Sequence, residues 1–290
     1  MGMVPLFLVL MVSGTIFLSW NDIQRKKYLD LGIDERYLMI FTFVMEGVIL
    51  CIPLLYVGIP VVKSSFWPAA VGTVVVNVIA QQFYFWSYKY SDASLVAPLR
   101  LVTAPLVVVT GFFVLGETVS ILGMLGIMAT VAGLWFLLFP KMRPTFRVDT
   151  GVAYGLIAAV LFAISFPLDK QTVISSSALF ASAVLFPSVG VLLLVLNLVR
   201  DRSFLVGFST TIRKQFLALL FMSSTLAVGT FLTNQALNYS LAAYAANLKR
   251  VQAVWTIIFS GAFLREKHIT QRLLATLVML FGIILSLAFR

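Results

Sequence analysis

Apolar residues run along the chain in long blocks, and short polar stretches separate them. A membrane-spanning helix needs about 20 mostly apolar residues. Ten blocks meet this requirement: 3–20, 37–57, 67–88, 91–115, 119–139, 151–173, 178–199, 214–238, 241–264 and 270–289. The connections between them are too short to hold a soluble domain. The pattern therefore predicts an all-α integral membrane protein with ten transmembrane helices in the lipid bilayer.

Composition supports this class and changes how the charge is interpreted. The 290 residues are 61% hydrophobic and 11% charged, with a mean hydropathy of +1.02, whereas a soluble domain carries about 25% charged residues. The 21 Lys and Arg against 11 Asp and Glu would indicate a nucleic-acid partner in a soluble protein. Here the basic residues gather in short connections, so we interpret them as topology determinants and expect no nucleic-acid partner.

The distribution of these basic residues predicts an orientation. They follow the first, third, fifth, seventh and ninth blocks, while the opposite connections hold little beyond Lys63 and Lys170. The positive-inside rule then places the basic connections in the cytoplasm and both termini outside. The first block lacks a basic leader and a small-residue cleavage site, so we expect a retained span. We expect a multi-pass protein of a prokaryotic plasma (inner) membrane.

The two halves of the chain align with each other at an offset of 149 residues. Aligned identical pairs include Tyr90 with Tyr239, Ala97 with Ala246, and Glu117 with Glu266. The alignment predicts five-helix repeats at 1–139 and 151–290, joined by a basic cytoplasmic linker at 140–150. Because five is odd, the second repeat enters the membrane from the opposite side. Such inverted repeats are typical of transporters that work by alternating access.

The ends of the fourth and ninth spans, "FFVLGETVS" and "AFLREKHIT", each precede a glycine-bearing span. With the two five-span repeats, these motifs resemble the EamA-type transporters of the drug/metabolite transporter superfamily over essentially the whole chain. The resemblance implies export or exchange of amino acids, drugs, sugars, nucleotide sugars or sugar phosphates. It also implies that neither ATP nor a bound cofactor is needed.

Polar residues inside spans are costly and usually face a cavity or a partner. At the offset of 149, Arg100 aligns with Lys249, so each half carries one cation at the same depth of its fourth helix. Arg250 follows Lys249, and adjacent helical residues point about 100° apart, so we expect the two to have different roles. The candidate substrate-binding residues are Arg100, Lys249, Arg250, Asn77, Gln81, Asn234 and Asn238.

Two other interpretations of these cations stay open. The long side chains could extend to the membrane surface, or they could form structural ion pairs with Glu46. Glu46 could alternatively carry a proton for coupled transport, since burial and neighbouring charge tune such a carboxyl group. Glu117 and Glu266 stand at helix ends, and we interpret them as structural or gating residues.

Several further residues limit the chemistry. Pro98 and Pro105 are expected to kink the fourth span and free backbone carbonyls. The aromatic stretch "QQFYFWSYKY" could stack on a substrate, but its position favours an interfacial belt. The single Cys51 excludes an intramolecular disulfide or a cysteine metal site, and the single His268 argues against histidine-centred catalysis. We expect no metal and no cofactor.

We therefore predict a secondary transporter or exchanger for a small anionic or zwitterionic metabolite, not an enzyme. The Lys249–Arg250 pair with Arg100 resembles the sugar-phosphate and nucleotide-sugar translocator branch, although those exchangers typically have Lys where this chain has Arg100. The alternatives are an exporter of amino acids or drug-like compounds, or a lipid flippase. A membrane enzyme would need an acidic metal motif, which the irregular Asp22, Asp30 and Asp34 do not form. Coupling to protons or to a counter-substrate, and a monomer or a homodimer, stay open.

Overall fold

The computed structural model describes residues 3–138, 149–201 and 204–266, together with the separate positions 269, 270, 276, 281 and 282. The first half contains α1 (Met3–Asp30), α2 (Glu35–Val57), α3 (Phe66–Tyr90), α4 (Ala93–Leu99), η1 (Arg100–Val102), α5 (Thr103–Leu115) and α6 (Ile121–Leu138). The second half contains α7 (Thr150–Ile174), α8 (Ala178–Arg200), α9 (Phe204–Ala236), η3 (Leu237–Tyr239), α10 (Ala242–Leu248), α11 (Val251–Phe259) and η4 (Ser260–Leu264).

The protein is an all-helical membrane protein. Within the described ranges, helices occupy each of the first nine predicted spans, and six of them (α1, α2, α3, α7, α8 and α9) are long and apolar enough to cross a membrane. Large apolar side chains such as Leu55 and Val199 are more than 80% exposed, as expected for surfaces that face lipid. The predicted tenth span at 270–289 and the linker at 140–148 lie almost wholly outside the described residues.

Two predicted polar connections are helical instead. The first span was expected to end at residue 20, but α1 continues to Asp30, and Gly32 with a φ of 80° follows it. The stretch 204–213 was expected to be a loop, but it forms the beginning of α9, with non-helical backbone angles at Gln215. The α1 prediction was wrong because several of its charged residues are buried against other helices, where hydrophobicity alone could not place them.

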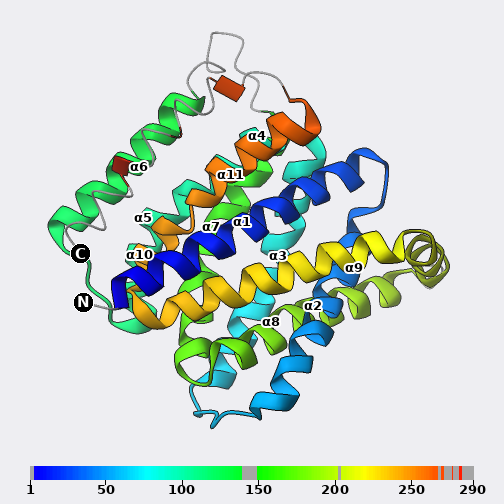
Figure 1. Cartoon of the computed structure of the whole chain (residues 1–290), viewed down its shortest axis with the longest axis horizontal. Coiled ribbons are helices and arrows are strands. Elements are labelled where there is room, and N and C mark those ends of the chain that lie inside the picture. The colour runs from blue at the N-terminus through cyan, green and yellow to red at the C-terminus, as the bar shows by residue number, and fades with distance from the viewer. Residues whose placement is uncertain are drawn as a thin grey trace.

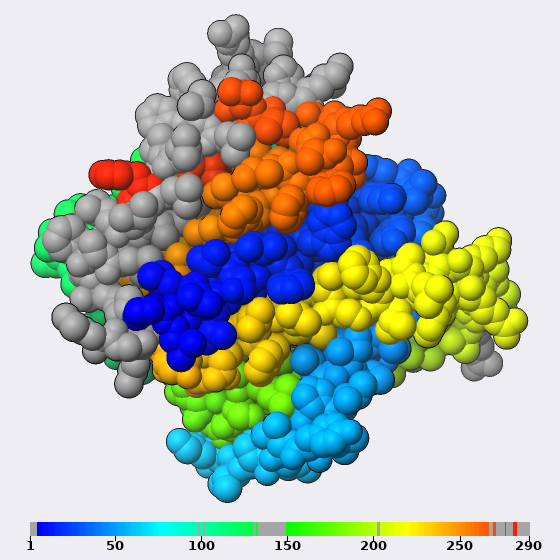
Figure 2. Space-filling model, in the orientation of Figure 1, coloured from blue at the N-terminus to red at the C-terminus, as the bar shows by residue number. Residues whose placement is uncertain are grey.

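The helices of each half pack mainly against helices of the other half. The first helix of each half packs against the third and fourth spans of the other half: α1 against α9 and α11, and α7 against α3 and α5. The second helices, α2 and α8, pack against each other (Figure 1). On the face shown in Figure 2, α1 lies between α9 and α11. This reciprocal packing is expected of two related halves.

The fourth and ninth spans run antiparallel to each other. The first half of the fourth span, α4, packs against α11, the second half of the ninth span. Correspondingly, α5 packs against α10. Spans at equivalent repeat positions therefore cross the bundle in opposite directions, which confirms the inverted duplication.

Glu117 and Glu266 join the ends of these two spans. Glu117 follows α5 and accepts a hydrogen bond from the Ala242 N–H at the start of α10 (2.6 Å). Glu266 follows η4 and accepts from the Ala93 N–H at the start of α4 (2.9 Å). Ala93 and Ala242 are themselves 149 residues apart, so the two contacts are equivalent. Carboxylates at helix N-termini satisfy unpaired N–H groups, and the structural interpretation of both glutamates is confirmed.

Lys170 adds an ion pair to one of these junctions. Its ammonium donates to Glu117 and to the Ser240 carbonyl, and both charged side chains are at most 14% exposed. Because a buried ion pair that loses one partner leaves an uncompensated charge, this contact should hold α7 firmly against the start of α10.

Glu117→Gln should therefore lower the unfolding free energy by roughly 3 kcal/mol, measured as a lower melting temperature in detergent. Adding Lys170→Met should recover part of that loss, because the unpaired ammonium is removed. The control is Glu35→Gln at the Lys89–Glu35 pair, whose lysine is 41% exposed and whose loss should cost about 1 kcal/mol or less. Simple addition of the Glu117→Gln and Lys170→Met losses in the double variant would contradict this account.

Candidate substrate site

The fourth and ninth spans both break at the predicted cations. Arg100 begins η1, the 3₁₀ turn between α4 and α5, and Lys249 and Arg250 lie between α10 and α11. At the second break the Arg250 N–H donates to Asn247 and the Gln252 N–H donates to Lys249, an i→i−3 pattern that tightens the chain. Breaks within membrane helices are typical of transporter binding sites.

Proline explains only one of the two breaks. Pro105 lacks the N–H that would bond to the Leu101 carbonyl, which loosens the helix just after Arg100. The ninth span contains no proline, yet it breaks at the matching position. The prediction of a kink in the fourth span is confirmed, whereas the equivalent break in the ninth span had no sequence signal.

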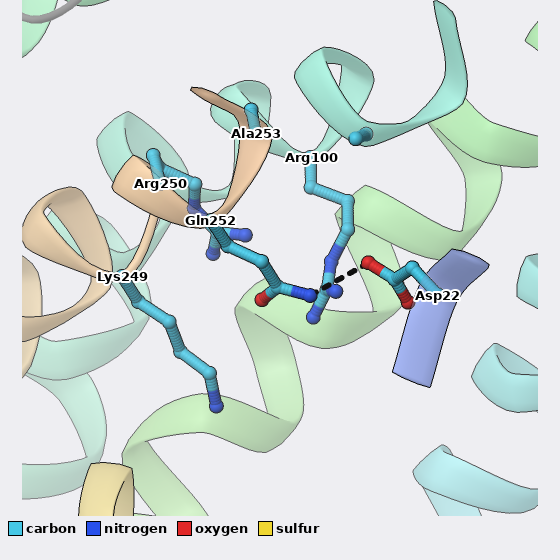
Figure 3. Close-up of a pocket in the computed structure, with 7 residues that line it drawn as sticks. Asp22, Arg100, Lys249, Arg250, Gln252 and Ala253 are labelled. Carbon is cyan, nitrogen blue, oxygen red and sulfur yellow. Dashed lines mark hydrogen bonds between the residues drawn. The ribbon is translucent and has the colours of Figure 1, made fainter. Parts of the chain in front are cut away.

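The breaks face a cavity between the two halves. About 420 Å³ of space not occupied by atoms, part of it open to the outside, lies between α1, α3, α9 and the two broken spans. Lining residues include Asp22, Arg25, Gln81, Tyr84, Arg100, Thr230, Lys249 and Gln252. A smaller adjoining space of about 190 Å³ is lined by Arg250 and Ala253 as well (Figure 3). The structure thus brings all three predicted cations to one place.

These cations have no direct carboxylate partner. Among the described residues, no carboxylate oxygen lies within 4.0 Å of the charged nitrogens of Arg100, Lys249 or Arg250. The three are close enough to one another to interact electrostatically. Glu46 lies close enough to Lys249 to interact electrostatically but forms no ion pair within 4.0 Å among the described residues, and like charges gathered at low dielectric favour a negatively charged ligand.

Lys249 and Arg250 occupy different surroundings, as their helical spacing predicts. Figure 3 shows their side chains leaving the helix break in different directions. The Lys249 ammonium lies 5.6 Å from the centre of the Phe166 ring, an aromatic contact that partly offsets its charge. Arg250 is only 5% exposed and forms no side-chain hydrogen bond within the described part of the chain.

Arg100 is held by a tyrosine. Its Nη1 donates to the Tyr84 hydroxyl (2.8 Å), and its guanidinium carbon lies 4.6 Å from the Tyr84 ring centre. The Tyr84 hydroxyl in turn donates to Asp22 (3.0 Å). Asp22 also accepts from Gln252 (2.7 Å), the contact drawn as a dashed line in Figure 3. One carboxylate thus links α1, α3 and α11 beside the cavity.

Arg25 is part of this network, although sequence placed it in a cytoplasmic connection. It is 4% exposed, forms an ion pair with Asp22 (2.8 Å), and donates to Asn21 (3.1 Å). Its guanidinium also lies 4.4 Å from the Phe85 ring centre. The placement of Arg25 in a connection was wrong, because it lies within α1 and its charge is compensated inside the bundle.

The aromatic stretch 81–90 divides between the interior and the surface. Tyr84, Phe85 and Tyr88 are at most 3% exposed, and Tyr84 lines the cavity, whereas Tyr90 is 53% exposed. The preference for an interfacial belt was therefore wrong for the inward-facing members of the stretch. A helical period places Tyr84 and Tyr88 on the same face as Gln81, a signal available in the sequence.

Glu46 is fully buried, near the middle of α2. Neither of its carboxylate oxygens accepts a hydrogen bond of good geometry within the described residues, although Thr230 and Lys249 lie close enough to interact with it. An acidic side chain in this setting is costly, which makes a functional role the default interpretation.

The four amide residues predicted to bind substrate occupy different positions in the structure. Gln81 lines the cavity. Asn77 donates to Thr73 (2.9 Å), whose hydroxyl donates to Asp169. Asn234 is buried but donates to Ser182 (2.9 Å), away from the lining residues. Asn238 is exposed in η3 and does not line the cavity.

The sequence-based site lacked Asp22, Tyr84 and Asp169. Asp22 was placed in a connection because "NDIQRKK" is strongly polar. A signal for a longer helix existed, since neither glycine nor proline occurs between Gly14 and Gly32.

Comparisons with known proteins agree with this architecture. The model of the EamA-like transporter family matches residues 5–139 and again residues 149–288. A solved structure described only as "Crystal structure of protein" matches with a TM-score of 0.70 at 15% sequence identity, over 98% of this chain and 97% of its own. At that identity the likeness concerns the fold alone. The comparison with curated proteins gave no match.

Tyr84→Phe should weaken the site without changing its apolar packing. The substitution removes the hydroxyl between Arg100 and Asp22, so the unfolding free energy should fall by about 2 kcal/mol, with a melting temperature several degrees lower in detergent. The matched control is Tyr56→Phe, because Tyr56 is 88% exposed and should change little. Equal melting temperatures for the two variants would contradict the importance of this contact.

Proposed function

The chain belongs to the EamA-like transporter family, and from that premise we propose that it is a secondary transporter for a small anionic or zwitterionic metabolite. The family is one of membrane transporters, not of enzymes, and membership implies a small-molecule substrate. The observation that carries the proposal is the group of three cations, Arg100, Lys249 and Arg250, with no directly paired carboxylate. An anionic substrate would supply the missing negative charge.

The positions of the cations support movement by alternating access. Arg100 lies seven residues after the start of α4, and Lys249 lies seven residues after the start of α10, but the two spans run in opposite directions. At about 1.5 Å per residue, each cation is roughly 10 Å from its own helix start, on opposite sides of the midplane. An anion that passes between the repeats would meet one cation from each side in turn.

The chemistry of the three side chains favours a phosphate or carboxylate group. A guanidinium donates through a planar fork that matches both groups, while an ammonium acts as a compact point charge. This combination, and the Lys249–Arg250 pair itself, supports a substrate like those of the sugar-phosphate and nucleotide-sugar translocator branch. The cations oppose the export of cationic drugs, since like charges repel strongly at low dielectric. Amino acid export is the alternative, and a lipid flippase is a third candidate.

We further propose how the chain sits in the membrane and moves. Repeats at 1–139 and 151–290 would rock against each other, joined by the basic linker at 140–150 on the cytoplasmic face. Both termini would lie outside a prokaryotic plasma membrane. The lining side chains leave only a narrow space, so the helices must separate for a metabolite to enter.

The test is uptake into proteoliposomes from a panel of phosphate monoesters, dicarboxylates and amino acids. For the best substrate, Lys249→Ala and Arg100→Ala should each lower uptake by about tenfold or more, because each removes a charge-assisted contact. Lys214→Ala is the matched control, since Lys214 is an exposed cation on α9. Full transport by both cavity variants would refute an anion site.

A variant of Glu46 distinguishes coupling to protons from coupling to a counter-substrate. If its carboxyl group carries the proton, Glu46→Gln should abolish uptake driven by a pH gradient and retain exchange of labelled for unlabelled substrate. Both activities are measured in the same proteoliposomes. Unchanged gradient-driven uptake in Glu46→Gln would exclude Glu46 as the proton carrier and favour coupling to a counter-substrate.

A further inference from the structure

Two aspartates occupy equivalent positions in the two repeats. Asp22 is the twentieth residue of α1, and Asp169 is the twentieth residue of α7. Gln24 and Gln171 follow them at the same spacing, so the first helices align at an offset of 147 residues, two fewer than the later spans. Because the repeats are inverted, the two aspartates lie toward opposite faces of the bundle.

Each aspartate accepts a hydrogen bond from the opposite repeat. Asp22 of the first repeat accepts from Gln252 of the second (2.7 Å). Asp169 of the second repeat accepts from Thr73 of the first, and Asn77 supports that hydroxyl. These contacts fix each carboxylate at the interface where the repeats must separate, and Asp22 also lines the cavity.

Each aspartate also faces the cation of its own repeat. Asp22 interacts electrostatically with Arg100 and is joined to it through the Tyr84 hydroxyl. Asp169 lies one helical turn beyond Phe166 on α7, whose ring centre is 5.6 Å from the Lys249 ammonium, and the Asp169 carboxylate is more than 4.0 Å from that ammonium. Neither Arg100 nor Lys249 forms a closed salt bridge with its aspartate, although Asp22 forms one with Arg25, so each of the two cations is compensated and still accessible to a ligand.

We propose that Asp169 and Asp22 are positioning residues that hold Lys249 and Arg100 in the cavity until an anion takes their place. Asp169 acts near the face of the bundle at which α7 ends, and Asp22 acts near the face at which α1 ends. That the aspartates compensate the cations follows from the contacts described above. That an anion displaces the aspartates rests on the proposed function. Substrate and aspartate thus compete for the same cation on each side.

A double-mutant cycle on Asp169 and Lys249 tests the pairing without any substrate. Lys249→Met is made first, and Asp169→Asn is then introduced both alone and in that background. Asp169→Asn alone should lower the melting temperature in detergent, and in the Lys249→Met background it should have no effect or raise it, a non-additivity of about 3 °C or more. The control cycle, Asp169→Asn with Arg100→Met, should be additive.

Inorganic phosphate is the probe for displacement. Its concentration for half-maximal thermal stabilisation should be several-fold lower in Asp169→Asn than in the unmodified protein, because the competing carboxylate is gone. Lys249→Met should lose most of the stabilisation. A purely structural role for Asp169 would leave this concentration unchanged.

The outcomes separate the two proposals. Additivity in the Asp169–Lys249 cycle overturns the pairing, whatever phosphate does. Non-additivity with the same phosphate concentration in the unmodified protein and in Asp169→Asn overturns displacement. Non-additivity with no response to phosphate in any variant supports the pairing and counts against the proposed anion site.

Discussion

The structure depends on the cost of holding charge away from water. A bilayer offers no solvent to Arg100, Lys249 or Arg250, so the protein must compensate them from within. It does so with a tyrosine, aromatic rings and carboxylates that stay more than 4.0 Å away. Direct salt bridges would be cheaper to bury but would leave nothing for a ligand to gain. Incomplete compensation is therefore the feature of the fold on which the proposed binding of an anion rests.

Inverted duplication supplies the geometry for this arrangement. A single five-helix unit could place one cation at one depth only. Two units of opposite direction bring Arg100 and Lys249 to one cavity from opposite ends of the bundle, and Glu117 and Glu266 link the two units at matching helix starts. α1 and α7 also pack reciprocally, each against the third and fourth spans of the other half. The symmetry between the halves therefore extends through the described part of the bundle.

Sequence could predict the class, the duplication and the cations, because long apolar blocks and aligned residues record them directly. It could not place Asp22 or Arg25, since a polar stretch in a membrane protein is normally a loop and only the packing of α1 on α9 and α11 buries it. The break at Lys249 was equally hidden, because no proline or glycine marks it. The prediction that Asn238 lines the site was wrong because this residue is polar for another reason: it is exposed at a helix end.

Arg250 has one further consequence. It stands opposite Leu101 in the repeat alignment, so the duplicated halves differ by a full charge next to the site. Two identical halves would give the two end states of the carrier the same free energy, with neither face favoured. A cation present in only one half removes that degeneracy, and the resting carrier should populate one orientation more than the other. The apparent substrate affinities on the two faces of the membrane would then differ because of this single position, while the gradients alone would set the direction of net transport.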